Sequence, residues 1–212
     1  RHLGAFAFTR WRMGLVFLML LPVVLVSGGW HTLSWASFGV LAFSGLIGIF
    51  VGDTALFASM NRLGPRRTGV LFATHACFSA LLGFVVLDER MGAQALLGGA
   101  LVVGGVMMAV ALGAHKNESH ALEVTRGHWP LGVALGLLAA LCQALGSLIA
   151  KPIMAAGVDP VTATVVRVGA TCVAHLVLLW AGVGVARTQN ALSARVLAWV
   201  ALSGMIGMGL GM

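Results

Sequence analysis

Ionisable side chains inside long apolar stretches are the residues of this sequence that could do chemistry. Asp53 is the one acid well inside such a stretch, and His75 and His175 lie deep in two others. A charge in hydrocarbon is costly, so each of these groups is a candidate functional residue. Asp53 could bind a cationic group or exchange a proton, or it could cap or pair locally near a helix end.

The basic and imidazole groups allow two interpretations each. Arg12 and Arg167 both lie one or two turns into an apolar stretch, where they could meet anionic groups of a substrate. We favour the alternative, in which both long side chains extend to the membrane interface. His75 and His175 could relay protons near neutral pH. A lone intramembrane histidine is more often neutral and hydrogen-bonded between helices.

Short polar side chains accompany these groups. Thr54 follows Asp53, Ser79 lies close to His75, and Gln143 is the only amide within its apolar stretch. Hydroxyls of this kind also bond to carbonyls of their own helix. The candidate substrate-binding residues are therefore Asp53, Thr54, His75, Ser79 and Gln143. The candidates for charge or proton coupling are Asp53, Arg12, Arg167 and His175.

Catalytic and metal-binding patterns are missing from the sequence. It has no HExxH, no GxSxG and no phosphate-binding glycine loop. Cys77, Cys142 and Cys172 lie in apolar runs without CxxC or Cys/His spacing, as buried reduced cysteines do. We therefore expect no enzyme activity, no cofactor, no metal site and no disulfide framework.

Composition places the chain in a membrane. Of its 212 residues, 59% are hydrophobic and 9% are charged, whereas soluble domains average about 45–50% and about 25%. The 29 glycines suit helices that approach closely in lipid. The net charge of +7 is dispersed between apolar runs, which favours a role in membrane orientation and not nucleic-acid binding.

Seven apolar stretches approach the length of about 20 residues that a membrane-spanning helix needs. We predict helices at 8–27, 35–60, 68–87, 93–113, 129–150, 160–185 and from 193 to the end of the chain. Residues 115–128 form the longest polar linker. The predicted fold class is thus an all-α polytopic membrane protein.

An internal repeat relates the two parts of the chain. Arg12-Met13-Gly14 recurs as Arg167-Val168-Gly169, and Ser44-Gly45-Leu46-Ile47-Gly48 recurs as Ser203-Gly204-Met205-Ile206-Gly207. The two offsets agree to within one short loop. The sixth predicted helix is then equivalent to the first, and the seventh to the second. This predicts a five-helix unit, and an odd number of helices makes the two copies inverted, as in many transporters.

The repeat also predicts the domain organisation. We assign residues 1–114 to the first repeat, 115–128 to a linker and 129–212 to the second repeat. A complete pair would have ten helices, so we expect one helix before Arg1 and the remainder after Met212. The piece alone would then lack part of its substrate site and would not be expected to transport.

The residues from Gly52-Asp53-Thr54-Ala55-Leu56-Phe57 to Gly105 resemble the EamA domain of the drug/metabolite transporter superfamily. Leu87-Asp88-Glu89-Arg90 is similar to that family's Leu-Gly-Glu-Arg signature, and a glycine-rich helix follows in both. Ala76 stands where the family often has a proline, which leaves a kink there in doubt. The resemblance implies a ten-helix carrier of small metabolites, often an exporter of amino acids, sugars, nucleosides or drugs.

The functional expectation is a secondary transporter that works by alternating access between inverted repeats. Its expected partners are the lipid bilayer and a small-molecule substrate, in a bacterial inner membrane, and a homodimer stays open. Two alternatives stay open: an intramembrane enzyme or flippase acting on a lipid-linked substrate, and a non-transporting scaffold or sensor subunit. Basic residues in the loops indicate one orientation and the family resemblance implies the reverse, so orientation stays open.

Overall fold

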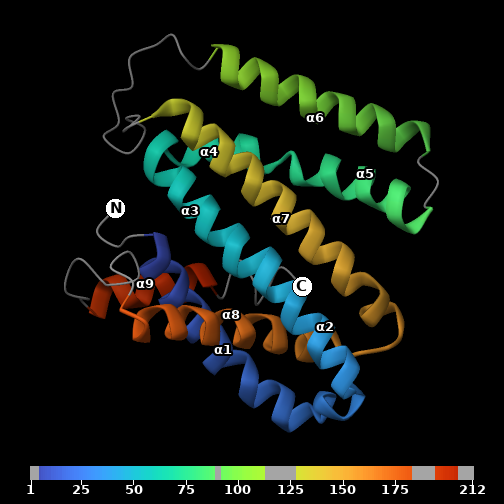
Figure 1. The fold of residues 1–212 in the computed structure, drawn as a ribbon, viewed down its shortest axis with the longest axis vertical. Helices are drawn as coiled ribbons and strands as arrows, with labels where there is room; N and C mark the ends of the chain where they lie inside the picture. Colours follow the sequence, from blue (N-terminus) through green and yellow to red (C-terminus); the bar gives the residue numbers. More distant parts are fainter. Residues whose placement is uncertain (1–4, 89–91, 113–127, 183–193, 205–212) are drawn as a thin grey trace. The chain divides into compact units, whose positions relative to one another are not determined.

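The computed structural model describes residues 5–88, 92–112, 128–182 and 194–204, and no strand occurs within these ranges (Figure 1). The helices are α1 (Ala5–Ser27), η1 (Gly29–Thr32), α2 (Trp35–Gly45), η2 (Leu46–Val51), α3 (Gly52–Leu63), α4 (Pro65–Phe72), α5 (His75–Leu87), α6 (Ala93–Leu112), α7 (Trp129–Ala155), α8 (Pro160–Trp180) and α9 (Ala194–Gly204). The prediction of an all-α polytopic membrane protein is confirmed. Glu89 and Arg90 of the signature, most of the 115–128 linker and the end of the last predicted helix lie outside the described residues.

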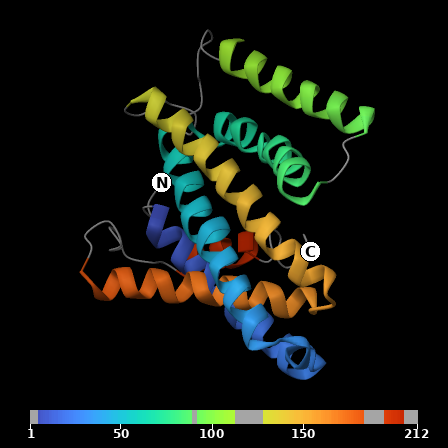
Figure 2. The ribbon, with the colours of Figure 1, turned by 45° about the vertical axis from the view of Figure 1, so that its right-hand side comes forward.

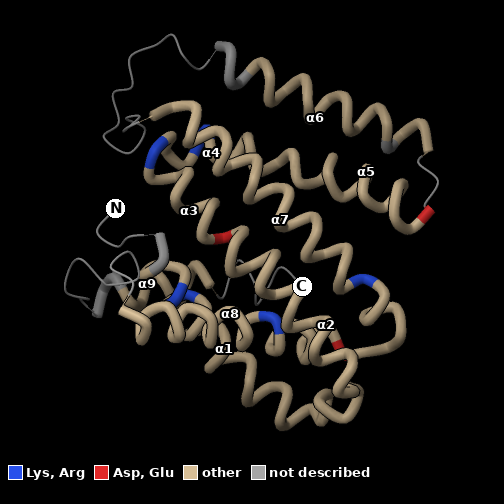
Figure 3. The backbone as a smooth tube through the Cα atoms, in the orientation of Figure 1, with Lys and Arg blue, Asp and Glu red and all other residues tan. Residues whose placement is uncertain are grey.

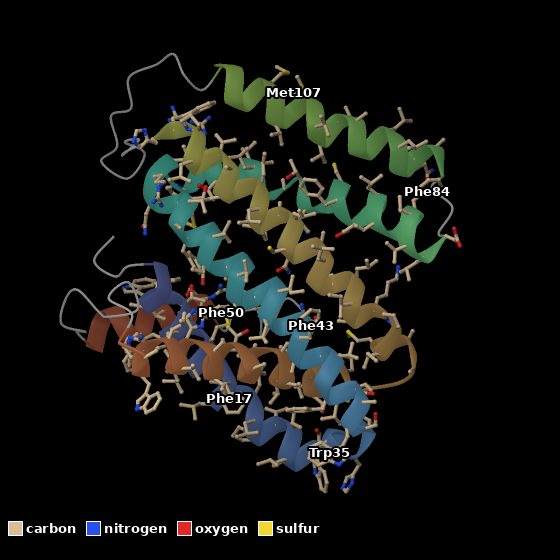
Figure 4. The ribbon with its side chains drawn as sticks, viewed as in Figure 1. Phe17, Trp35, Phe43, Phe50, Phe84 and Met107 are labelled. Carbon is tan, nitrogen blue, oxygen red and sulfur yellow. The ribbon has the colours of Figure 1, made fainter. Side chains whose placement is uncertain are left out.

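Five helical segments among the described residues are long and apolar enough to cross a membrane. They are Ala7–Ser27, Trp35–Leu63, Pro65–Leu87, Trp129–Ala155 and Pro160–Trp180. The other two predicted spans correspond to α6 and α9. Large apolar side chains on these helices are exposed, among them Trp35, Phe43, Phe84 and Met107 (Figure 4). Such exposure suits a surface in contact with lipid, which is itself apolar.

The fifth predicted helix continues past its expected end. Lys151-Pro152 was expected to stop it at residue 150, but α7 continues to Ala155, and the Ala156 amide donates to the Pro152 carbonyl over 3.0 Å. A proline interrupts a helix because it lacks an N–H and crowds the carbonyl four residues earlier. Pro152 stands in the last turn of α7, where neither effect prevents the final bonds from forming.

Two compact units make up the chain. One contains Arg1–Phe50 and Ile149–Met212, and the other contains Val51–Leu148. We call them the terminal unit and the central unit. The long helical segments Trp35–Leu63 and Trp129–Ala155 each contribute to both units. The units reflect spatial contacts and the two repeats reflect sequence equivalence, so the repeat boundaries stay a prediction.

In the terminal unit, α8 packs along α1 and α2, and α9 packs against α1 (Figure 1). One apolar cluster joins Met13 and Val16 of α1 to Ile49 and Val168. A second cluster contains Leu41, Ala150, Val158 and Ala163. Side chains from segments far apart in the sequence therefore share a dry core.

The start of α8 is determined by its capping residues. Pro160 stands at the first helical position, and the Asp159 carboxylate accepts a hydrogen bond from the Thr162 amide over 2.8 Å. This satisfies one of the orphan amides of the first turn. The Asp159 amide in turn donates to the Thr32 hydroxyl over 3.0 Å. This hydrogen bond holds the short helix η1 against the beginning of α8.

In the central unit, α3 turns into α4 through Gly64, whose φ of 84° suits a residue without a side chain. The helix α6 lies alongside α5 (Figure 2). Ser59 links α3 to two neighbours: its hydroxyl donates to the Gly132 carbonyl over 2.8 Å and lies 3.2 Å from the Thr68 hydroxyl. These contacts fix α3 between α4 and α7.

Candidate functional site

The predicted site residues divide between the two units. The five substrate-binding candidates, Asp53, Thr54, His75, Ser79 and Gln143, all belong to the central unit. The three remaining coupling candidates, Arg12, Arg167 and His175, belong to the terminal unit. Each group is therefore described within its own unit.

The first turn of α3 carries two buried polar side chains. Asp53 and Thr54 are 7% and 9% exposed. Gly52 precedes them and lies against α7, since a methyl group placed on it would be 3.4 Å from Cys142 Cβ and 3.7 Å from the backbone nitrogen of Gln143. The absence of a side chain at Gly52 thus brings the buried turn of α3 next to Gln143.

The Thr54 hydroxyl has an unusual environment. Its oxygen is buried and has no hydrogen-bond partner among the described residues. A helical threonine normally bonds to a carbonyl one turn earlier in its own helix, and an unsatisfied buried hydroxyl costs free energy. A ligand with a polar group beside α3 would remove that cost. Thr54 is therefore the candidate whose geometry is most directly suited to binding.

A π-helical segment, η2, stands immediately before this turn. It covers Leu46–Val51 and interrupts the α-helical hydrogen bonding of the long span Trp35–Leu63. Single π turns in α-helices often occur at functional sites because they shift the register of the side chains that follow. The sequence predicted one uninterrupted helix here, and the composition of η2 gave no signal of the change.

The third predicted span, 68–87, is also interrupted. The structure divides it into α4 and α5 around Ala73 and Thr74, although the whole stretch Pro65–Leu87 still qualifies as one membrane span, as predicted. The Thr74 amide and hydroxyl both donate to the Leu71 carbonyl, over 3.1 and 2.7 Å. The break forms without a proline because the Thr74 side chain satisfies a carbonyl that the interrupted helix releases.

His75 takes part in the same break. Its Nδ1 lies 3.1 Å from the Phe72 carbonyl oxygen, and its ring stacks on the Phe72 ring with centroids 5.2 Å apart. These contacts are local, as expected for a structural histidine. Ser79 is half-buried one turn further along α5. The grouping of His75 and Ser79 with Asp53 stays a prediction.

In the terminal unit, three polar side chains follow one face of α8. Arg167, Thr171 and His175 are spaced four residues apart, and Thr171 and His175 are 0% and 2% exposed. The Thr171 hydroxyl lies 3.0 Å from the Arg167 carbonyl oxygen and 3.2 Å from the Gly45 carbonyl oxygen. It thereby bridges α8 and the end of α2, just before η2.

His175 is the last of these three residues along α8. Its Nδ1 lies 2.9 Å from the Thr171 carbonyl oxygen. The rings of Phe50 and His175 meet edge to face, with centroids 4.6 Å apart. The contact holds the end of α8 against η2. Sequence analysis did not single out Thr171 or Phe50, although Thr171 lies midway between two residues that it did.

The two repeated arginines meet the two repeated glycines. Gly45 of α2 lies against the backbone of Arg167 in α8, and Gly204 of α9 lies against Arg12 in α1. Each copy of the Ser-Gly motif thus touches the arginine of the other copy. The sequence supplied both motifs but not this exchange of partners.

A metal centre is not formed by the described residues, where no three His, Cys, Asp or Glu side chains gather. The long apolar helices with exposed hydrophobic surfaces define a multi-pass membrane protein. Residues 1–111 match the model of the EamA-like transporter family, a family of small-molecule transporters. The chain belongs to this family. No curated protein and no solved structure matches it.

Proposed function

We propose that the protein is a secondary transporter that moves small metabolites, such as amino acids, nucleosides or drugs, across a bacterial inner membrane. One observation carries the proposal: a buried polar turn, Asp53-Thr54, begins α3 directly after the π-helical segment and beside Gln143. Interrupted helices with buried polar groups are typical of transporter binding sites.

Alternating access requires two repeats that exchange roles. A two-fold relation that exchanges α1 with α8 and α2 with α9 would convert the Gly45–Arg167 contact into the Gly204–Arg12 contact. This reciprocity supports the inverted repeat predicted from the sequence. The ten-helix carrier built on such a repeat would open to each side of the membrane in turn.

Asp53 and Thr54 are the residues we expect to contact the substrate. Full-length protein in liposomes should show saturable uptake of at least one solute from a panel of polar metabolites. Replacing Asp53 with Asn should reduce that uptake at least tenfold, since it removes the buried carboxyl group that we expect to contact the substrate. Asp88→Asn is the matched control, because Asp88 is exposed and has a φ of 52°, which asparagine tolerates.

The result that contradicts the proposal is equally specific. A full-length protein that binds and moves no solute across the panel would favour a scaffold or sensor subunit. Cysteine placed at Gln143 should react with a water-soluble thiol reagent if a cavity opens there. Leu101→Cys, on an exposed part of α6, supplies a lipid-facing control.

A further inference from the structure

The π-helical turn η2 is not explained by the residues of its own span. Trp35–Leu63 contains no proline, and it carries no charged residue before Asp53 (Figure 3). The Ser44-Gly45 pair before η2 makes a distortion of the helix easier, but it does not select the π register over the α-helical one. That selection needs a contact from another helix.

Thr171 of α8 supplies such a contact. Its side chain is fully buried, and its hydroxyl lies 3.2 Å from the carbonyl oxygen of Gly45, the last residue of α2 before η2 begins at Leu46. In a regular α-helix that carbonyl would accept a hydrogen bond from the amide of Ile49, four residues later. A second donor on the same oxygen draws it toward α8 and weakens this bond, which favours the longer spacing of a π turn.

The same hydroxyl has an alternative acceptor. It lies 3.0 Å from the Arg167 carbonyl oxygen of its own helix, and a hydroxyl has one proton to donate. When Thr171 donates to the Gly45 carbonyl, it stabilises the π register of η2. When it donates to the Arg167 carbonyl, the Gly45 carbonyl is left to the amides of its own span. Thr171 therefore has two arrangements, and one of them stabilises η2.

The equivalent position in the other copy of the repeat has no hydroxyl. Val16 follows Arg12 by four residues, as Thr171 follows Arg167, and a methyl group placed on Gly204 would lie 2.7 Å from Val16 Cγ2. Valine and threonine have nearly the same shape. At this position the two helix crossings therefore differ by one hydroxyl, and the crossing that has it adjoins the π turn.

The register of η2 determines where the side chains after it point. Residues of an α-helix are about 100° apart around its axis, so a change of one residue in register turns the side chains that follow by about that angle. Asp53 and Thr54 begin α3 directly after η2. Phe50 lies within η2, and a turn of this size would separate its ring from that of His175, whose centroid is 4.6 Å away.

We propose that Thr171 is a positioning residue: by donating to the Gly45 carbonyl, it holds η2 in the π register in which Asp53 and Thr54 bind the substrate. The inference rests on the proposed function, because it concerns the same buried turn. Loss of the hydroxyl lowers the fraction of protein in this register and leaves the binding groups themselves intact. Saturating substrate then draws the remaining molecules back into the π register.

The first test measures uptake by the full-length protein in liposomes, with a radiolabelled amino acid or nucleoside that the wild type transports. Thr171→Val should raise KM about two- to tenfold, because one interhelical hydrogen bond no longer favours the competent register. Its Vmax should stay near that of the wild type, since saturating substrate restores the register. Valine fits the site, as Val16 does at the equivalent crossing. Thr171→Ser keeps the hydroxyl and should restore the wild-type KM.

A second measurement does not depend on transport. Replacing Phe50 with 4-fluorophenylalanine gives one fluorine resonance, which reports on the edge-to-face contact with His175. We expect Thr171→Val and Thr171→Ala to move this resonance and Thr171→Ser to leave it in place. Ser203→Ala removes a hydroxyl that bonds to a carbonyl of its own helix over 2.8 Å. This control should change neither KM nor the resonance.

The outcomes separate this inference from the proposed function. If the wild type transports no solute of the panel, the proposed function fails, and the fluorine resonance alone decides whether Thr171 sets the register of η2. If the wild type transports but Thr171→Val lowers Vmax at an unchanged KM, Thr171 has a structural role only and the inference is overturned. An unmoved resonance in Thr171→Val also overturns it, because η2 then keeps its register without the hydroxyl.

Discussion

Gly45 lies against the backbone of Arg167, so closely that a methyl group on Gly45 would be 2.7 Å from Arg167 Cα. The Thr171 hydroxyl adds a 3.2 Å contact to the Gly45 carbonyl oxygen at the same crossing. Close backbone approach at a small residue is a principal source of helix association in lipid, where the hydrophobic effect does not drive helices together. The crossing of α2 and α8 therefore depends on a glycine at position 45.

Gly45→Ala should destabilise the protein, because the obstructing atoms are backbone and cannot move without shifting α8. Overpacking of this kind costs about 1–3 kcal/mol. Thermal unfolding in detergent would measure it as a lower Tm. Gly39→Ala on the same helix is the control, since a methyl group there would meet nothing within 4 Å. Equal Tm values for the two variants would contradict the close packing of α2 against α8 at Gly45.

Gly204→Ala should destabilise the equivalent crossing less than Gly45→Ala does. A methyl group on Gly204 would lie 2.7 Å from Val16 Cγ2, which is a side-chain atom that can rotate away, and 3.5 Å from Arg12 Cγ. We expect a loss of about 1 kcal/mol or less. The same unfolding assay ranks the two variants, and Gly14→Ala serves as the unhindered control. A larger loss at Gly204 than at Gly45 would contradict the packing.

Ser59→Ala should weaken the central unit. The Ser59 side chain is fully buried and bonds to the Gly132 carbonyl and the Thr68 hydroxyl, so its removal leaves both without that partner. Interhelical hydrogen bonds of this type in membranes contribute about 0.6–1.7 kcal/mol. Reversible unfolding in denaturing detergent would report the change. Ser147→Ala on α7 removes an exposed hydroxyl and should be neutral.

Thr54→Val should separate function from stability. Because the Thr54 hydroxyl has no partner among the described residues, its loss should leave the unfolding free energy within about 0.5 kcal/mol of wild type or raise it. Substrate uptake should nevertheless fall severalfold if the hydroxyl binds the ligand. Thr171→Val is the opposite control, since Thr171 bridges two helices and its loss should lower Tm. A Thr54→Val variant with reduced stability and normal uptake would refute the assignment.

The helical segments follow from the sequence to within a few residues. Apolar stretches and their polar boundaries predicted α1, α6 and α8 because a membrane admits backbone only when its hydrogen bonds are made internally. The sequence likewise identified Asp53, Thr54 and Gln143 as candidates, and the structure packs Gly52, the residue before Asp53, against the Gln143 backbone. The grouping could not be derived from sequence because α3 and α7 meet through Gly52, one of many glycines.

The interruptions within the second and third predicted helices could be seen only in the tertiary structure. Nothing in Leu46–Val51 distinguishes a π turn from an α-helical one, and the break at Ala73 and Thr74 occurs without a proline. Hydrogen bonds that differ by one residue in register have similar local energies, so contacts with neighbouring helices decide between them. Thr171, which bonds to the Gly45 carbonyl, is one such contact.

The amino-acid sequence by itself determined that this chain is a helical membrane protein, because hydrophobicity and helix length are properties of each segment alone. Its resemblance to the EamA domain came from motifs and not from composition. It also supplied the repeated Arg and Ser-Gly motifs. Only the tertiary structure decided that Gly45 pairs with Arg167 and Gly204 with Arg12. Which glycine packs against which helix depends on contacts between segments more than a hundred residues apart. These contacts cannot be derived from the local sequence.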